Sequence, residues 1–352
     1  MTKRRFAAFA AGAVVGTATL MVSVLLAADL YAHHRVERSV GVNRQGYRGP
    51  VAGRKQPGET RVVMLGGSTV FGYDVEWDDT IPAALERQLR ARDPNARVIN
   101  LGFIGEGALA FVPTLESYAY LDYDVVCLYE GYNDLLGDAE PNRYLLRHSS
   151  PVFRLTGYFP ILPLVLREKA MTLRHGSVAA AYESERSAPK TVFRPNVANR
   201  ASAVAMETTA AVTQSIDRQL GRFSDLDAAP RLDGSGCAPP WRHYCNAEAA
   251  AVRFALARQA SVVVVSQPRL LGDRADRHAS QQRALAEMLA RDFAGEPRVR
   301  HVDASGAVDL SSEAVTFDGL HLNRDGNMKV AATLVDPIST LIDARRHQRD
   351  RQ

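Results

Sequence analysis

Short β-type runs that alternate with helical patterns limit the folds open to this chain of 352 residues. The runs cover residues 61–65, 97–100, 124–129, 261–266 and 298–302, and the helical patterns cover residues 80–92, 108–121, 198–221 and 327–346. The third run is apolar along most of its length, as expected of a strand that is buried on both faces. Strands joined by helices need right-handed crossovers, which produce a parallel sheet. The pattern therefore predicts an α/β fold with a parallel five-stranded sheet.

The N-terminal segment is of a different kind. Three basic residues at positions 3–5 precede an uncharged stretch over residues 6–28. A helix of that length spans about 35 Å, enough to cross a bilayer core of about 30 Å. The basic cluster favours a cytoplasmic N-terminus with the rest of the chain outside. We expect an uncleaved signal anchor over residues 1–31; a cleaved signal peptide is the alternative, but the large residues Leu26 and Leu30 disfavour its cleavage sites.

The rest of the chain divides by composition. A polar lead-in is expected over residues 32–60, a domain over 61–346 with an insertion at 135–258, and a polar tail over 347–352. Within the insertion, the apolar stretch 152–166 can form a lid, an acyl-binding wall or a patch on the bilayer, or can simply pack against the sheet.

The composition excludes several classes of protein. Hydrophobic residues make up 46% and charged residues 23%, which excludes a collagen-like, a wholly disordered or a polytopic membrane chain. Only 5 of the 43 basic residues are Lys, they are scattered, and the net charge is only +4. The sequence therefore predicts no nucleic-acid partner.

Four short blocks carry groups that can react. They are Gly66–Thr69 after the first run, Asn100–Gly105 after the second, Glu130–Asp134 after the third, and Asp318–His321 before the last helical pattern. In an open parallel sheet, ligands bind beyond the carboxyl ends of the strands, so these blocks are expected to meet at one edge. Taken singly, each block has a simpler interpretation as a turn, a helix cap or half of a metal site. Together they supply a nucleophile, hydrogen-bond donors and an acid–base pair, which an ester hydrolase needs.

The four blocks, in this order, resemble the SGNH (GDSL-type) hydrolase superfamily over about residues 61–346. The resemblance implies a three-layer α/β/α, flavodoxin-like fold and, with the N-terminal helix, a bacterial membrane-anchored member. It implies a catalytic triad of Ser68, Asp318 and His321. It also implies an oxyanion hole formed by Ser68, Gly105 and Asn133. Gly67 stands where the family often has Asp, which removes a supporting hydrogen-bonding group but no reacting group.

The physical roles of the triad follow from its residue types. A serine hydroxyl is a weak nucleophile, so Ser68 needs His321 as a base, and His321 needs Asp318 to fix its tautomer. The sequence around Ser68 lacks the Gly-x-Ser-x-Gly pattern, so an α/β-hydrolase elbow is not supported. No second His or Cys stands at ligand spacing near the Asp-x-x-His pair, so neither a metal nor a cofactor is expected.

The sequence thus predicts a serine esterase that faces outward from the membrane. It would hydrolyse acyl or acetyl esters, of a glycan or a lipid, through an acyl-Ser68 intermediate. One alternative is an O-acyltransferase that modifies an envelope or exported polysaccharide. Another is a non-catalytic SGNH-like assembly partner. The sequence leaves the acyl length, the alcohol part of the substrate and the oligomeric state open.

The three cysteines give a further expectation. Cys127 lies within the third run, where a thiol behaves as a small buried hydrophobic group. Cys237 and Cys245 lie eight residues apart in a stretch rich in Gly and Pro. A metal site that included His243 would have only three ligands, at a spacing that fits no common zinc site. Outside the cytoplasm these two thiols are expected to form a disulfide.

Overall fold

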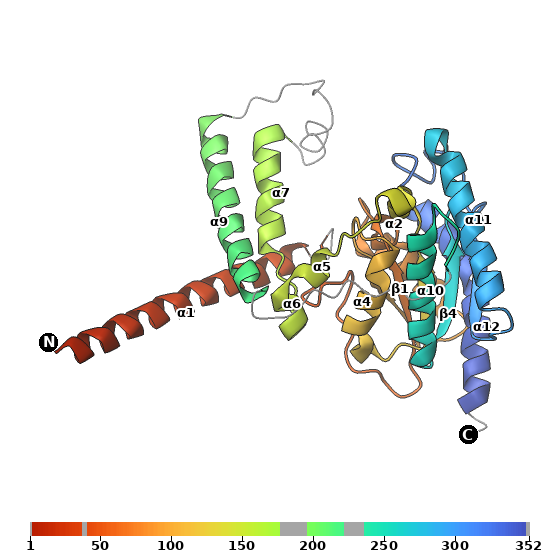
Figure 1. Cartoon of the computed structure of the whole chain (residues 1–352), viewed down its shortest axis with the longest axis horizontal. Helices are drawn as coiled ribbons and strands as arrows, with labels where there is room; N and C mark the ends of the chain where they lie inside the picture. Colours follow the sequence, from red (N-terminus) through yellow and green to blue (C-terminus); the bar gives the residue numbers. More distant parts are fainter. Residues whose placement is uncertain (1, 37–40, 177–195, 222–235, 350–352) are drawn as a thin grey trace. The chain divides into compact units, whose positions relative to one another are not determined.

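The computed structural model describes residues 2–36, 41–176, 196–221 and 236–349 (Figure 1). The chain forms two compact units. One contains Met1–Val36 and Ser150–Asp225, and the other contains Glu37–Ser149 and Leu226–Gln352. Each unit is described below by itself.

The larger unit is built on a five-stranded sheet. Its strands are β1 (Thr60–Gly66), β2 (Ala96–Asn100), β3 (Val125–Tyr129), β4 (Ser261–Ser266) and β5 (Val299–Asp303). The spatial order is β2-β1-β3-β4-β5, and every neighbouring pair is parallel. The predicted parallel five-stranded sheet is therefore confirmed. The strand order reverses between β1 and β3, and such a switch point is where open α/β sheets bind their ligands.

Helices cover both faces of this sheet (Figure 1). On one face lie α3 (Ile81–Arg90) and α12 (Arg324–Arg349), and on the other lie α4 (Phe111–Ser117), α10 (Arg242–Ala257) and α11 (Ala275–Asp292). The apolar side chains of α3 and α12 form one core with the strands, in which Leu85, Val125 and Leu334 are fully buried. This gives the three layers expected of a flavodoxin-like fold.

Short helices connect these layers. They are α2 (Ser68–Phe71), η1 (Trp77–Asp79), η2 (Ala108–Ala110), η3 (Ala119–Leu121), η4 (Tyr132–Asp134), η5 (Gly137–Ala139), α5 (Leu146–Ser149) and η6 (Gly272–Arg274). The single helix predicted over residues 108–121 is wrong, because η2, α4 and η3 divide that range. Pro113 lacks an N–H and is tolerated only in a first helical turn, so α4 begins just before it.

The smaller unit contains α1 (Lys3–Val36), α6 (Pro151–Thr156), α7 (Leu162–His175) and α9 (Val197–Gly221). Helices α7 and α9 pack together, with an ion pair of 2.6 Å between Arg174 and Glu207. Only part of the insertion predicted at 135–258 belongs to this unit, because α10 packs on the sheet of the larger unit. The apolar stretch 152–166 forms most of α6 and the start of α7.

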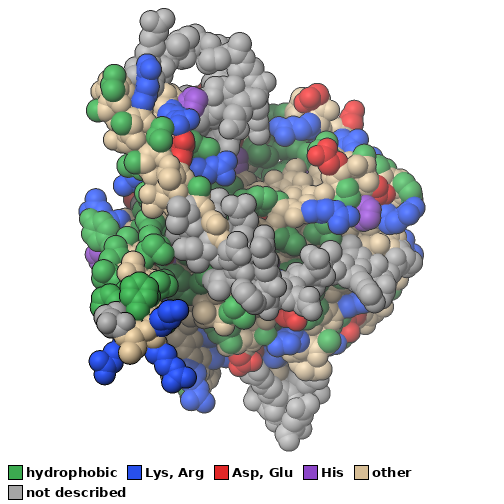
Figure 2. Space-filling model, turned by 60° about the vertical axis from the view of Figure 1, so that its left-hand side comes forward, with side chains coloured by type: hydrophobic (Ala, Val, Ile, Leu, Met, Phe, Trp, Pro, Cys, Tyr) green, Lys and Arg blue, Asp and Glu red, His purple; other side chains and the backbone are tan. Residues whose placement is uncertain are grey.

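Helix α1 is the one helix among the described residues that is long and apolar enough to cross a membrane. Its large apolar side chains are exposed, and Figure 2 shows hydrophobic side chains gathered where α1 comes forward, with Lys and Arg side chains beside them. The helix continues to Val36, beyond the expected boundary at residue 31. Its last two turns contain the buried polar residues Asp29 and His33, whereas the preceding turns are apolar and exposed.

The cysteines behave as the sequence predicts. Cys237 and Cys245 form a disulfide with their Cα atoms 5.6 Å apart. Cys127 is a buried free thiol within β3, and burial raises its pKa.

Candidate active site

Ser68 stands at the carboxyl edge of the sheet, where β1 turns into α2. The strand ends at Gly66 and the helix begins at Ser68. The backbone N–H of a residue in the first turn of a helix has no partner within that helix, so the Ser68 N–H is available to a ligand. The side chain is only partly buried, which leaves its hydroxyl within reach of substrate.

The structure brings the three predicted triad residues together. The Oγ atom of Ser68 lies 2.9 Å from Nε2 of His321. The other ring nitrogen of His321, Nδ1, lies 2.7 Å from Oδ2 of Asp318. A proton on Nδ1 that is donated to Asp318 leaves the lone pair of Nε2 facing the hydroxyl, which is the tautomer that a general base requires.

The turn before α12 positions the acid and the base. The second carboxylate oxygen of Asp318, Oδ1, accepts the backbone N–H groups of Leu320 at 3.0 Å and His321 at 2.7 Å. Burial raises the pKa of Asp318, but the hydrogen bonds from the backbone and ring of His321 outweigh it, so the pKa lies below its usual range. Asp318 therefore stays ionised beside His321 at neutral pH.

Two predicted oxyanion donors lie in the loops that follow β2 and β3. Gly105 has a φ of +79°, a conformation that favours glycine, and its carbonyl oxygen accepts a 2.9 Å hydrogen bond from the side chain of Asn142. The Nδ2 atom of Asn133 donates to the carbonyl oxygen of Glu106 at 2.9 Å. An amide nitrogen carries two hydrogens, so Asn133 keeps a second N–H for a substrate oxygen.

Buried polar contacts fix the loop that follows β2. Arg147 forms a 2.7 Å ion pair with Glu106, and both side chains are almost fully buried. The Arg147 guanidinium also lies over the ring of Phe103, 4.7 Å from its centroid. From the neighbouring loop, Oδ2 of Asp134 accepts the N–H of Ala108 at 2.9 Å. These contacts hold Gly105 and Glu106 in place opposite Asn133.

Gly67 lies in close contact with two side chains that follow β3. A Cβ atom on Gly67 would lie 2.0 Å from Nδ2 of Asn133 and 2.7 Å from Oε2 of Glu130. The space that a side chain would need is therefore occupied by two groups from the end of β3. The absence of an acid at position 67 leaves no gap here, because a carboxyl group from β3 fills it.

A group of buried acids beneath the site was missed by sequence reasoning. It consists of Glu130, Asp134 and Glu248, all buried. Burial raises the pKa of each acid. Asp134 raises the pKa of Glu130 further, and Asp134 and Glu130 together raise that of Glu248. Two of them lie in the recognised Glu130–Asp134 block, but Glu248 comes from α10, so only the fold reveals the group. Among the residues that the structure describes, no three His, Cys, Asp or Glu side chains are arranged to hold a metal ion.

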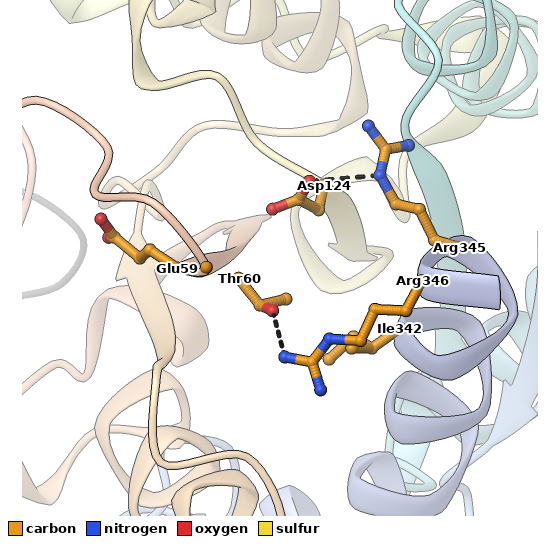
Figure 3. A pocket seen from close by; sticks show the side chains of 7 residues that line it. Glu59, Thr60, Asp124, Ile342, Arg345 and Arg346 are labelled. Atoms are coloured by element: carbon orange, nitrogen blue, oxygen red, sulfur yellow. Dashed lines mark hydrogen bonds and ion pairs between the residues drawn. The ribbon is translucent and has the colours of Figure 1, made fainter. Parts of the chain in front are cut away.

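A small pocket lies at the opposite, amino edge of the sheet (Figure 3). It is lined by Gly58, Glu59, Thr60, Asp124, Ile342, Arg345 and Arg346. Arg345 pairs with Asp124 at 3.1 Å, and Arg346 donates to Thr60 at 3.0 Å. These contacts attach the end of α12 to the starts of β1 and β3, so this pocket has a structural explanation.

No family model and no curated protein matches this chain. Solved structures are similar at low identity, as the following three show. The esterase EstA of a Pseudoalteromonas species is 10% identical, with a TM-score of 0.43 over 81% of this chain and 100% of that one. A lipolytic G-D-S-L family protein of Veillonella parvula is 12% identical, with a TM-score of 0.40 over 79% and 97%. The acetylxylan esterase Axe2 of Geobacillus stearothermophilus, a catalytic mutant, is 12% identical, with a TM-score of 0.40 over 79% and 93%.

The chain resembles the SGNH (GDSL-type) hydrolases in its parallel sheet, in the order of its four blocks and in the contacts among Ser68, His321 and Asp318.

Proposed function

We propose that this chain is a serine esterase. The observation that carries the proposal is the continuous contact from Ser68 Oγ to His321 Nε2 at 2.9 Å and from His321 Nδ1 to Asp318 at 2.7 Å. The three residues come from two blocks that are 250 residues apart in the sequence. Structural hydrogen bonds seldom create this order of nucleophile, base and carboxylate at the ligand-binding edge of a parallel sheet.

The reaction follows from these positions. His321 Nε2 takes the hydroxyl proton while Ser68 Oγ attacks the ester carbonyl carbon, and the carbonyl oxygen becomes negative. The N–H groups of Ser68 and Gly105 and the amide of Asn133 stabilise that oxygen; loss of one such donor typically costs about 3–4 kcal/mol of barrier. The alcohol leaves with the proton from His321. Water then attacks the acyl-Ser68 with His321 as base, which releases the acid.

The surroundings of the triad support a glycan ester as substrate. The ring of Tyr73 lies 4.7 Å from the ring of His321, and the ring of Tyr144 lies 3.2 Å from where a Cβ of Gly105 would be. Phe317 directly precedes Asp318, and all three rings are exposed. Rings that are rigid and amphipathic suit contact with the flat faces of sugars. An acyl-Ser68 so placed can also pass its acyl group to a sugar hydroxyl, which is the transferase alternative.

Hydrolysis of p-nitrophenyl acetate and longer esters, with and without a sugar acceptor, tests the proposal. We expect hydrolysis by the full-length protein and loss of nearly all of it in Ser68→Ala; the exposed Ser311→Ala serves as the control. His321→Ala should lose nearly as much, and the double variant little more, because triad residues act as a unit. Undiminished turnover by Ser68→Ala overturns the mechanism. An acylated sugar product indicates the transferase, and complete inactivity a non-catalytic partner.

We further propose that α1 is an uncleaved anchor and that the site faces away from the cytoplasm. The basic residues at positions 3–5 support that orientation. Asp29 and His33, near the end of α1, support retention of the helix because they are buried and contact Leu162 and Phe159 of the same unit. The disulfide also favours an oxidising compartment. In whole cells, Cys237 and Cys245 should resist thiol alkylation until reductant is added; free thiols at both positions count against this orientation.

A further inference from the structure

Glu130 is buried at the carboxyl end of β3, next to the site, although no step of the reaction uses it. Its side chain is 1% exposed. One carboxyl oxygen, Oε1, accepts the N–H of Gly131 at 2.8 Å and the N–H of Asn133 at 3.1 Å. A single acceptor thus closes the turn from which the Asn133 side chain projects, and the backbone of the amide donor cannot rotate without breaking a buried hydrogen bond.

The side chain of Asn133 is confined on two further sides. Its Nδ2 atom donates to the carbonyl oxygen of Glu106 at 2.9 Å. On the other side it lies against Gly67, so closely that a Cβ on Gly67 would be only 2.0 Å away. Backbone and side chain of Asn133 are therefore held by different groups, and Glu130 is the one that holds the backbone.

The second carboxyl oxygen of Glu130 makes the residue expensive for the fold. Oε2 is buried against the backbone of Gly67, whose N–H favours the ionised form of Glu130. Burial of a carboxyl group destabilises a folded protein unless all its hydrogen bonds are made, whereas an apolar side chain of the same size would not. The residue is therefore better explained by what it does for Asn133 than by any gain in stability.

We propose that Glu130 is a positioning residue, which fixes the Asn133 amide where it can donate to the oxyanion. This inference rests on the proposed esterase function. Glu130 touches neither the triad nor the reacting atoms, and it acts through Asn133 alone. Glycine at position 67 belongs to the same arrangement, because any larger residue would displace the amide that Glu130 positions.

Two substitutions separate the hydrogen bonds of Glu130 from its volume. Glu130→Met keeps the length of the side chain and removes both acceptors, while Glu130→Gln keeps the oxygen that Gly131 and Asn133 need. Each is made in the full-length protein and in the Asn133→Ala background, and kcat for p-nitrophenyl acetate is measured. We expect Glu130→Met to lower kcat by about 10²-fold, approaching the loss of an oxyanion donor, and Glu130→Gln to recover most of it. With Asn133 already removed, Glu130→Met should change kcat by less than about threefold, because coupled residues are not additive.

Glu248→Gln is the matched control. Glu248 is an equally buried acid of the same group, and neither of its carboxyl oxygens makes a hydrogen bond to the turn at Asn133. Glu248→Gln should change kcat by the same factor in the full-length protein and in its Asn133→Ala variant. If Glu130→Met lowers kcat equally in both backgrounds, Glu130 is structural and the inference is overturned.

Hydrogen exchange gives a readout that is independent of activity. The backbone amides of Gly131 and Asn133 should exchange faster in Glu130→Met and at the wild-type rate in Glu130→Gln. Unchanged exchange in Glu130→Met overturns the inference even if the enzyme is active. Suppose that Glu130→Met exchanges faster but the wild-type protein shows no Ser68-dependent hydrolysis. That result overturns the proposed esterase function, and with it the catalytic role of the positioning.

Discussion

At the scale of single residues, the buried acids determine how stability depends on pH. Burial, with the neighbouring Asp134, raises the pKa of Glu130 from 4.5 to about 8, and burial raises that of Asp134 from 3.8 to about 7. The other titratable groups around them are Glu248 and Tyr244 from α10, Cys127 and Tyr129 from β3, and Tyr132 from η4. No cation is among these neighbours, so the protonated form of each acid is favoured in the folded protein.

The sign of the pH effect follows from this. Between about pH 4.5 and about pH 8 folded Glu130 keeps a proton that the unfolded chain has released, so the contribution of this acid to the free energy of unfolding should fall as pH rises. Urea unfolding across that range measures the slope. Glu130→Gln should remove this contribution, because an amide does not titrate, so the stability of the variant should fall less with pH, or rise more, than that of the wild type. The exposed Glu116→Gln should leave the slope unchanged. Equal slopes for Glu130→Gln and the wild type would contradict the raised pKa of Glu130.

Asp318 offers a second prediction at this scale. In Asp318→Asn the side-chain amide no longer favours a proton on Nδ1 of His321, so Nε2 is no longer held as the acceptor for Ser68. We expect kcat to fall by about 10³- to 10⁴-fold, with thermal stability little changed because Asp318 is half exposed. Ester hydrolysis and thermal unfolding of the same preparation measure both. A loss below tenfold would mean that Asp318 does not orient the base.

The residues that the sequence could identify are those in compact blocks. Ser68, Asp318 and His321 stand next to strand ends or helix starts, so their meeting at one edge of the sheet could be predicted from topology. Glu248 could not, because it comes from a helix more than 100 residues after Asn133 and has no motif of its own. The close contacts of Gly67 could not be predicted for the same reason, because the groups that surround it follow another strand.

At the scale of elements, strands were easier to predict than helices. Every strand end lies within one residue of its predicted position, and the buried strands were short apolar runs in the sequence. The range 108–121 shows the opposite case. Its apolar pattern is continuous, but Pro113 restricts where α4 can begin, and the left-handed Asp122, with φ of +51°, ends η3. Backbone constraints of this kind override hydrophobic periodicity.

The loop that follows β2 gives a prediction for an element. Arg147→Met leaves the Glu106 carboxylate buried without its partner, and breaking a buried pair in this way typically costs about 3–5 kcal/mol. The double variant with Glu106→Gln should recover part of that loss, because no unpaired charge remains. Urea unfolding of both variants and of Glu106→Gln measures the coupling. Equal stability of Arg147→Met and wild type would show that this pair does not hold the loop.

At the scale of the whole molecule, the sequence indicated a long apolar N-terminal helix and an insertion, but not the contacts between them. The predicted boundary at residue 31 divides α1, whose polar end belongs to the same compact unit as α6, α7 and α9. Asp29 accepts the N–H of Leu162 and the hydroxyl of Tyr158, and Nε2 of His33 lies 3.0 Å from the carbonyl oxygen of Phe159. These contacts join positions about 130 residues apart, which no local pattern can reveal.

Deletion of residues 1–36 tests this division of the molecule. The triad and its donors belong to the other unit, so the truncated protein should leave the membrane fraction and still hydrolyse p-nitrophenyl acetate. The deletion removes the Asp29 carboxylate, which accepts the N–H of Leu162 and the hydroxyl of Tyr158. Helices α7 and α9 should therefore become more sensitive to limited proteolysis. Full-length Asp29→Ala is the matched variant: it should remain in the membrane, show the same proteolytic sensitivity and keep its activity. Loss of hydrolysis in Asp29→Ala, with the larger unit still folded, would show that the membrane-proximal unit contributes to catalysis.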